Sequence, residues 1–163
     1  MATVHVQDDA TPELPLLREA LRSGSPSDQA AAAEQLGRLG DGTATGVLES
    51  AVADEDRPAD VRLVAADALG RIGWTRSARP LSQVLAHALS PDLRCAAATA
   101  LGRIGDPSSL AVLTAGLASP SAAVRRACAE ALLGLGAEGR EWLGVLAAGS
   151  GDAADAARTA LQN

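Results

Sequence analysis

The chain has 163 residues, enough for one continuous hydrophobic core, and its 20 acidic and 14 basic residues give a net charge of −6. This acidity argues against nonspecific binding to nucleic acid or to anionic membranes. With no Tyr, no Phe and two tryptophans, the composition also argues against β-structure, in which aromatic and β-branched residues are enriched.

Residues 1–11 are polar and carry no periodic pattern, so we expect a flexible N-terminal segment. They lack the basic and apolar regions of a secretory signal. No apolar run reaches the roughly 18 residues of a membrane span, and two cysteines do not make a disulfide framework. We therefore expect a cytoplasmic protein without membrane contact. Because every basic residue is Arg, and Ala and Gly abound, the composition is typical of a bacterial genome rich in G and C.

From residue 12 onward, apolar residues recur at helical spacing and predict pairs of helices. In the first pair, prolines lie in the first turn of a helix over 13–21, where a missing N–H costs little. Ser25-Pro26 then reads as an N-cap and a first helical residue, ahead of a helix through 30–38. The predicted helices of the later pairs span 43–53 and 59–71, 76–89 and 91–103, 107–117 and 120–134, and 138–148 and 152–161.

One motif, Ala-Leu-Gly-Arg-Ile-Gly, stands at 68–73 and 100–105, with variants at 35–40 and 131–136 and a fragment at 160–163. Its copies are spaced by 29 to 33 residues, and each full copy ends in a Gly suited to the left-handed residue after a helix. One hairpin cannot bury its apolar face alone, so the hairpins are expected to stack. We predict one all-α superhelix (an α-solenoid) over 12–163, with five repeats at about 12–40, 41–73, 74–105, 106–136 and 137–163.

The stretches 60–73 and 92–105 share the frame Asp-x-Arg-x-x-Ala-Ala-x-Ala-Leu-Gly-Arg-Ile-Gly, and 124–132 matches part of it. This frame resembles HEAT repeats, most closely the subtype named after phycobilisome lyases. The resemblance implies an α-solenoid whose second helices face the concave side. It also implies a structural ladder in which Arg62, Arg94 and Arg125 reach acids or loop carbonyls of a neighbouring repeat. The first and last copies lack this Arg, as capping repeats should.

The register of the repeats also predicts the core. Leu17, Leu48, Leu85, Leu113 and Trp142 share one position of the first helices, which we expect to be buried. In the second helices, Ala65, Ala97 and Cys128 share a position that suits only a small side chain, and Gly70 is expected to permit close contact between helices.

Two rows of charge are predicted on the second helices. Arg38, Arg71 and Arg103 share a position near the helix ends, where they either complement the helix dipole or form a ridge that receives an acidic partner. Glu34, Asp67, Thr99 and Glu130 share another position and form an acidic and polar row beside it. Rows of opposite sign suit a protein or peptide partner better than duplex DNA.

Two single residues, Trp74 and Cys95, leave alternatives open, whereas the two histidines do not. Trp74 stands where other copies have Asp, and is either an exposed anchor for a partner or a cover for the adjacent hairpin. Cys95, beside Arg94 near a helix start, is either a small apolar filler or a reactive thiol. His5 and His87 are far apart in the sequence and show no metal-ligand spacing, so we expect no metal site and surface positions for the histidines.

We therefore expect a non-catalytic interaction module or scaffold, without a cofactor, that binds another protein or peptide on its concave face. The expected contact residues are Arg38, Arg71, Arg103, Glu34, Asp67, Glu130 and Trp74. The resemblance also implies an alternative, an accessory subunit of a bilin lyase or other tailoring enzyme, although few aromatic residues are present to stack a bilin. The Ala-rich stretch 152–161 is compatible with an end-to-end homodimer.

Overall fold

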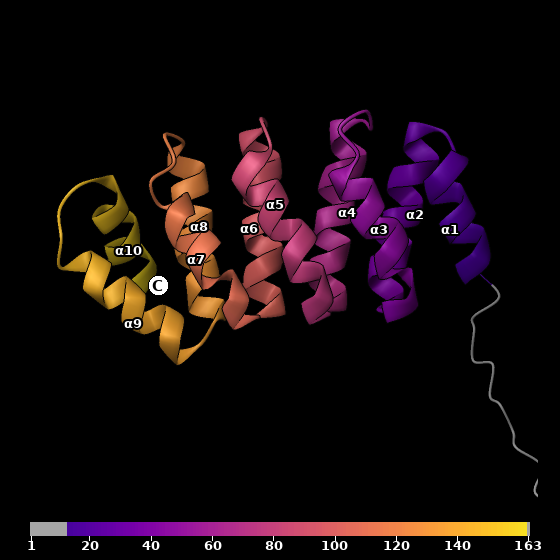
Figure 1. Cartoon of the computed structure of the whole chain (residues 1–163). Helices are drawn as coiled ribbons and strands as arrows, with labels where there is room; N and C mark the ends of the chain where they lie inside the picture. The colour runs from indigo at the N-terminus through magenta and orange to yellow at the C-terminus, as the bar shows by residue number, and fades with distance from the viewer. Residues whose placement is uncertain (1–12, 163) are drawn as a thin grey trace, which may run out of the picture.

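The computed structural model is a row of helical hairpins stacked side by side (Figure 1). The structure describes residues 13–162, so the expected flexible segment 1–11 lies outside the described residues. Within this range there are ten α-helices, three short 3-10 helices and no strand. The prediction of an all-α solenoid of five hairpins is confirmed.

Odd-numbered helices are the first helices of their hairpins and even-numbered ones the second helices. The helices are α1 (Leu14–Ser23), α2 (Pro26–Leu39), α3 (Thr45–Ala53), α4 (Ala59–Ile72), α5 (Ala78–His87), α6 (Pro91–Ile104), α7 (Leu110–Gly116), α8 (Ala122–Gly134), α9 (Ala137–Ala147) and α10 (Asp152–Gln162). The 3-10 helices η1 (Gly42–Ala44), η2 (Thr75–Ser77) and η3 (Pro107–Ser109) precede α3, α5 and α7. These three α-helices therefore begin two or three residues later than expected, because the chain first makes a tighter turn.

Local capping residues explain where the second helices begin and end. Ser25 caps α2 as part of a capping box: its hydroxyl accepts from the Asp28 N–H, and the Asp28 carboxylate accepts from the Ser25 N–H. The second helices α2, α4 and α6 each end at a left-handed Gly, with φ of +67° at Gly40, +74° at Gly73 and +68° at Gly105. The helix α8 begins two residues later than the predicted start at residue 120, because Ser121 is its N-cap.

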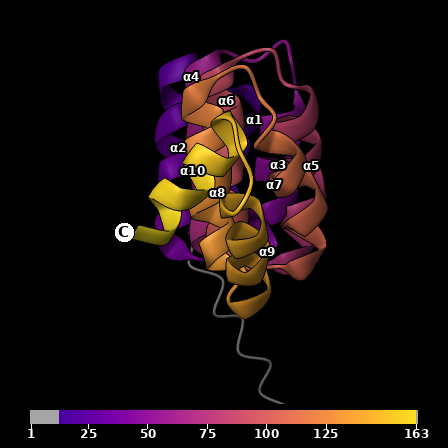
Figure 2. The same cartoon turned by 90° about the vertical axis from the view of Figure 1, so that its left-hand side faces the viewer.

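The helices form two layers, with α2, α4, α6, α8 and α10 on one side and α1, α3, α5 and α7 on the other (Figure 2). Successive second helices touch closely because a Gly of one faces an Ala of the next. A Cβ at Gly37 would lie 2.7 Å from the Ala68 Cα, and one at Gly70 would lie 2.8 Å from the Ala100 Cα. Gly102 faces Ala131 in the same way. The expectation for Gly70 is thus confirmed, and the second helices share more contacts than the first helices do.

The core runs through the array between the two layers. Leu48, Leu85 and Leu113 are buried as predicted, whereas Leu17 is only partly buried. The prediction for Trp142 was wrong: 44% of it is exposed, and its neighbour Leu143 is fully buried instead.

The turn before α9 explains this shift of register. Four junctions join the five described hairpins, and only the last of them lacks a 3-10 helix. There α9 begins directly after Gly136, whose φ of +76° and ψ of −138° redirect the chain. The earlier junctions each insert η1, η2 or η3 before the next first helix. Without that insertion α9 presents Leu143 to the core, and Trp142 faces outward.

Candidate functional site

The charged side chains predicted on the second helices lie together on the surface of that layer. Arg38 pairs with Glu34 at 2.6 Å on α2, and Arg71 pairs with Asp67 at 2.8 Å on α4. Arg103 on α6 also pairs with Asp67 and so connects two neighbouring helices. Ion pairs thus connect residues of the two predicted rows within α2 and α4, and one pair crosses from α4 to α6. We call the whole set the second-helix charge row (Glu34, Arg38, Asp67, Arg71, Thr99, Arg103 and Glu130).

The charge row continues into a hollow of 230 Å³ between α6 and α8. Arg103 and Thr99 line it from α6, and Glu130 lines it from α8. Small residues, among them Gly102 and Ala131, also line it. Glu130 has a second cation nearby, because the Arg126 Nε lies 3.7 Å from its carboxylate. The hollow thus has a guanidinium on one side and a carboxylate on the other.

Trp74 lies apart from this row, in the turn between α4 and η2. Its ring rests on the loop of the preceding hairpin, because a Cβ at Gly42 would lie only 1.9 Å from the ring atom Cζ2. At the same time 45% of Trp74 is exposed. The indole therefore covers an adjacent loop and still offers one part of its surface to solvent.

The three predicted ladder arginines hold carbonyl groups: Arg62 and Arg94 at the ends of first helices, and Arg125 in the loop after α7. The Arg62 Nε donates to the Val52 carbonyl at 3.1 Å, and the Arg94 Nε donates to the Leu85 carbonyl at 2.8 Å. Both bonds lie within the arginine's own hairpin. The resemblance had implied bonds to a neighbouring repeat instead. Arg125 does both: it donates to the Ser119 carbonyl and pairs with Asp152 of the next hairpin at 2.8 Å.

Sequence reasoning missed that the end hairpins contain replacements for the ladder arginine. Gln29 stands at the ladder position of the first hairpin and donates from Nε2 to the Gly24 carbonyl at 2.9 Å. Arg57 supports it from the α3–α4 loop, with bonds of 2.6 Å to the Leu21 carbonyl and 2.9 Å to the Gln29 Oε1. In the last hairpin Arg158, one turn after the ladder position, donates to the Ala147 carbonyl at 2.7 Å. A search for any long donor near that position would have found both replacements.

The environments of the two thiols favour packing rather than reactivity. Burial and the nearby Asp92 carboxylate raise the pKa of the Cys95 thiol, which is the opposite of activation. Burial raises the pKa of the Cys128 thiol to about 12. Cys95 therefore fits the filler interpretation.

The remaining candidates give no metal or membrane site in the described part of the chain. His87 is exposed on α5 and lines a hollow with Glu55 and Arg62, whereas His5 lies outside the described residues. Between residues 13 and 162, no three His, Cys, Asp or Glu side chains are grouped as metal ligands would be. None of the described helices is both long and apolar enough to cross a membrane.

Comparison with known proteins identifies the repeat. A family model for HEAT repeats matches residues 14–90 and again residues 78–163. No curated protein sequence matches the chain.

Several solved structures share the fold. Phycocyanin lyase from Nostoc sp. PCC7120, in the complex of CpcE and CpcF, is 20% identical over 93% of this chain and 77% of that chain, with a TM-score of 0.54. Human deoxyhypusine hydroxylase in complex with glycerol is 22% identical over 91% and 72%, with a TM-score of 0.61. An engineered protein is 21% identical over 91% and 78%, with a TM-score of 0.58. At these identities the likeness shows the fold alone.

Proposed function

The chain belongs to the HEAT-repeat family, and from that premise we propose that it is a non-catalytic interaction module that binds a partner protein through its second-helix charge row. The observation that carries this proposal is the continuity of the row. Exposed charges of both signs extend over α2, α4, α6 and α8, which pack side by side. An extended segment of a partner that crosses these helices would meet a charged group at each of them.

The shape of the array favours this side over the other. Second helices pack more closely than first helices, and from this we infer that the array curves toward the second-helix layer. That layer is then the inner side of the superhelix, where a bound segment touches several hairpins at once.

Binding a partner on this row would break only weak ion pairs within the chain. The arginine side chains in the row keep 65%, 43% and 47% of their surface exposed at Arg38, Arg71 and Arg103. Exposed ion pairs contribute only about 0–1 kcal/mol to stability. A partner with alternating charges can therefore exchange these pairs for its own contacts. The hollow between Arg103 and Glu130 would accept one polar side chain that both donates and accepts hydrogen bonds.

Charge reversal on the row tests the proposal. A partner is isolated by affinity purification from the native host, and its binding to the purified chain is then measured by calorimetry. We expect the double variant Arg71→Glu, Arg103→Glu to weaken binding at least tenfold. The double variant Arg79→Glu, Arg140→Glu, which changes exposed arginines of first helices by the same total charge, should stay within twofold of the unaltered chain. Undiminished binding by the first variant would place the partner site elsewhere.

The alternative, an accessory subunit beside a bilin lyase, rests on a likeness to phycocyanin lyase that shows the fold alone. Stacking a bilin favours aromatic side chains, and this chain offers only Trp74 and Trp142. No observation on the surface favours this function over partner binding. An absorbance shift on mixing the purified chain with free bilin would reverse that preference.

A further inference from the structure

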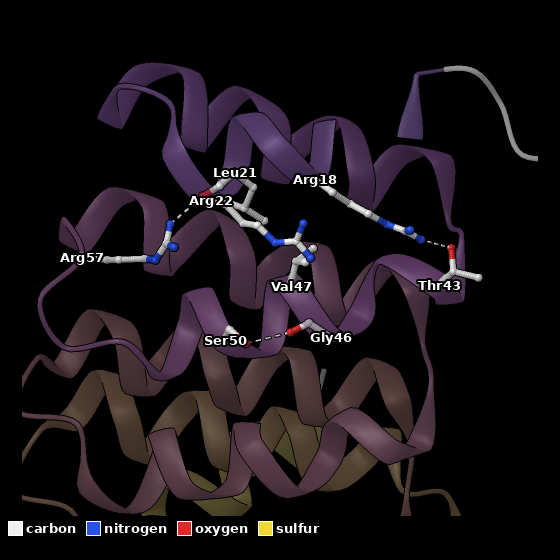
Figure 3. Close-up of a pocket in the computed structure, with 8 residues that line it drawn as sticks. All are labelled: Arg18, Leu21, Arg22, Thr43, Gly46, Val47, Ser50 and Arg57. Carbon is white, nitrogen blue, oxygen red and sulfur yellow. Dashed lines mark hydrogen bonds between the residues drawn. The ribbon is translucent and has the colours of Figure 1, made fainter. Parts of the chain in front are cut away.

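A second hollow lies on the opposite layer, between the first helices α1 and α3, and has a volume of 320 Å³ (Figure 3). Three arginines line it: Arg18 and Arg22 come from α1, and Arg57 comes from the loop after α3. The hydroxyls of Thr43 and Ser50 stand at its border. Among the residues described, no carboxylate lines this hollow, although the whole chain carries a net charge of −6.

The three guanidinium groups differ in how far they are engaged. Arg57 is engaged by the Leu21 carbonyl, by Gln29 and by Asp54, and so forms a fixed cationic wall. Among residues 13–162, Arg22 pairs only with Glu19, at 3.9 Å, and its side chain is 60% exposed. Arg18 donates one N–H to Thr43, and its Nε is buried without a hydrogen-bond partner within residues 13–162. A buried donor left unpaired costs about 1–3 kcal/mol, so an acceptor placed here would relieve that cost.

We propose that this hollow binds a phosphate group. Guanidinium groups bind phosphate with paired N–H donors in a planar fork. Figure 3 shows Arg22 lying between Arg18 and Arg57, above Val47. The Ser50 hydroxyl already donates to the Gly46 carbonyl, and the Arg57 Nε and Nη1 are engaged by other groups. The N–H donors for a bound anion therefore come mainly from Arg18 and Arg22, and the positive charge of these two side chains favours a dianion over a carboxylate. The volume holds a phosphate together with part of a small molecule that carries it, against the apolar Leu21 and Val47.

Binding is measured by titrating the 163-residue chain with inorganic phosphate, glycerol 3-phosphate and acetate at constant ionic strength, since salt screens exposed charges. We expect saturable shifts of the Gly46 amide resonance with either phosphate probe and at least tenfold weaker binding of acetate. If glycerol 3-phosphate binds more tightly than inorganic phosphate, the natural ligand is a phosphate ester. If it binds equally or more weakly, the ligand is free phosphate. Arg18→Ala and Arg22→Ala should each weaken binding at least tenfold, and Arg126→Ala on α8 should leave it unchanged. Acetate binding as tight as phosphate, or no saturable shift, would overturn the proposal.

A steric block gives a test that does not depend on charge. Gly46 lines the hollow, and a Cβ built on it meets no atom within 4 Å. Gly144 on α9 is equally open but lies far from the hollow in the array. Gly46→Leu should fold, because Leu favours helix more than Gly does, and should abolish phosphate binding. Gly144→Leu should bind phosphate like the unaltered chain. Normal phosphate binding by Gly46→Leu would place the anion elsewhere.

The phosphate site is independent of the partner site proposed on the second helices. The Arg71→Glu, Arg103→Glu variant should keep its affinity for phosphate, and Gly46→Leu should keep its affinity for the partner protein. Loss of both activities in either variant would mean a general defect of folding rather than a defect of one site.

Discussion

At the scale of single residues, four of the five hairpins are closed by a long side chain that donates to the end of the first helix, and in the fourth hairpin Arg125 donates to the Ser119 carbonyl in the loop after α7. Arg62 and Arg94 do this in the second and third hairpins, and Gln29 and Arg158 do it in the first and last. A guanidinium and an amide both serve, so the requirement is for a donor of sufficient reach. The carbonyls they hold belong to the last turn or C-cap of a helix, where no later helical N–H can pair with them.

A substitution can remove the hydrogen bond from Arg94 to the Leu85 carbonyl and still keep an apolar side chain of similar length. Arg94→Met preserves the apolar chain but has no N–H for the Leu85 carbonyl, which lies 2.8 Å from the Arg94 Nε. We expect a loss of about 1–2 kcal/mol in the free energy of unfolding, measured by urea denaturation. Arg79→Met, at an exposed site on α5, should change it by less than about 0.5 kcal/mol. Equal effects of the two substitutions would contradict the role of the bond.

The Cys128 side chain fills the space between α8 and α7. Its Sγ occupies space beside α7, since a Cβ at Gly116 would lie 2.3 Å from it. The second and third hairpins instead have Ala65 and Ala97 at the Cys128 position. Cys128→Ala therefore places in the fourth hairpin a residue that the fold already uses.

This substitution should alter how stability depends on pH. The pKa of the Cys128 thiol is raised from 9.0 to about 12 in the folded chain. As pH rises between these values the unfolded thiol ionises and the folded one does not, so stability is lost by up to about 1.4 kcal/mol per pH unit. Urea denaturation from pH 8 to 10.5 should show a steeper loss for the unaltered chain than for Cys128→Ala. Parallel pH profiles for the two would contradict the burial effect.

At the scale of helices, features set by local residues could be predicted and those set by junctions could not. Ser25 and the left-handed Gly residues after α2, α4 and α6 mark their helix ends directly in the sequence. The 3-10 turns and the outward Trp142 depend on how one hairpin joins the next, which no repeat pattern contains. The ion pair between Arg103 and Asp67 also required the structure, because it crosses between two helices. The rows themselves followed from register alone.

The close contact of second helices gives a prediction about helix packing. Gly70→Ala would place a Cβ 2.8 Å from the Ala100 Cα, where only backbone movement can make room. We expect a loss of about 1–3 kcal/mol, although Ala favours helix over Gly by about 0.8–1.0 kcal/mol. Gly144→Ala, which meets nothing within 4 Å, should instead stabilise the chain in the same chemical denaturation assay. A stabilising Gly70→Ala would mean that the two helices separate freely.

At the scale of the whole molecule, the strength of the stack is uneven. Gly37, Gly70 and Gly102 each let one second helix approach the next, but α8 has Leu133 at that position. Accordingly, α8 and α10 share fewer contacts than α6 and α8 do. The first-helix layer is also weaker there, because α7 and α9 share less contact than α5 and α7 do. Among the described helices, the fifth hairpin is therefore held mainly through α8.

In a stack of repeats, local stability follows from each repeat and its contacts with neighbours. The fifth hairpin has one neighbour and a reduced interface with it, so it should open at lower free energy than the centre of the array. We expect amides of α9 and α10 to exchange hydrogen at least tenfold faster than those of α4 and α6, measured by mass spectrometry on the native chain. The first hairpin is the internal control, because it also has one neighbour but keeps the close contact at Gly37 and the added bonds of Arg57. The α2 amides should exchange more slowly than those of α10. Both helices belong to a hairpin at an end of the array, so the difference comes from the interface with the neighbouring hairpin. Equal exchange in α2 and α10 would show that being terminal, rather than losing the glycine contact, sets the order in which the array opens.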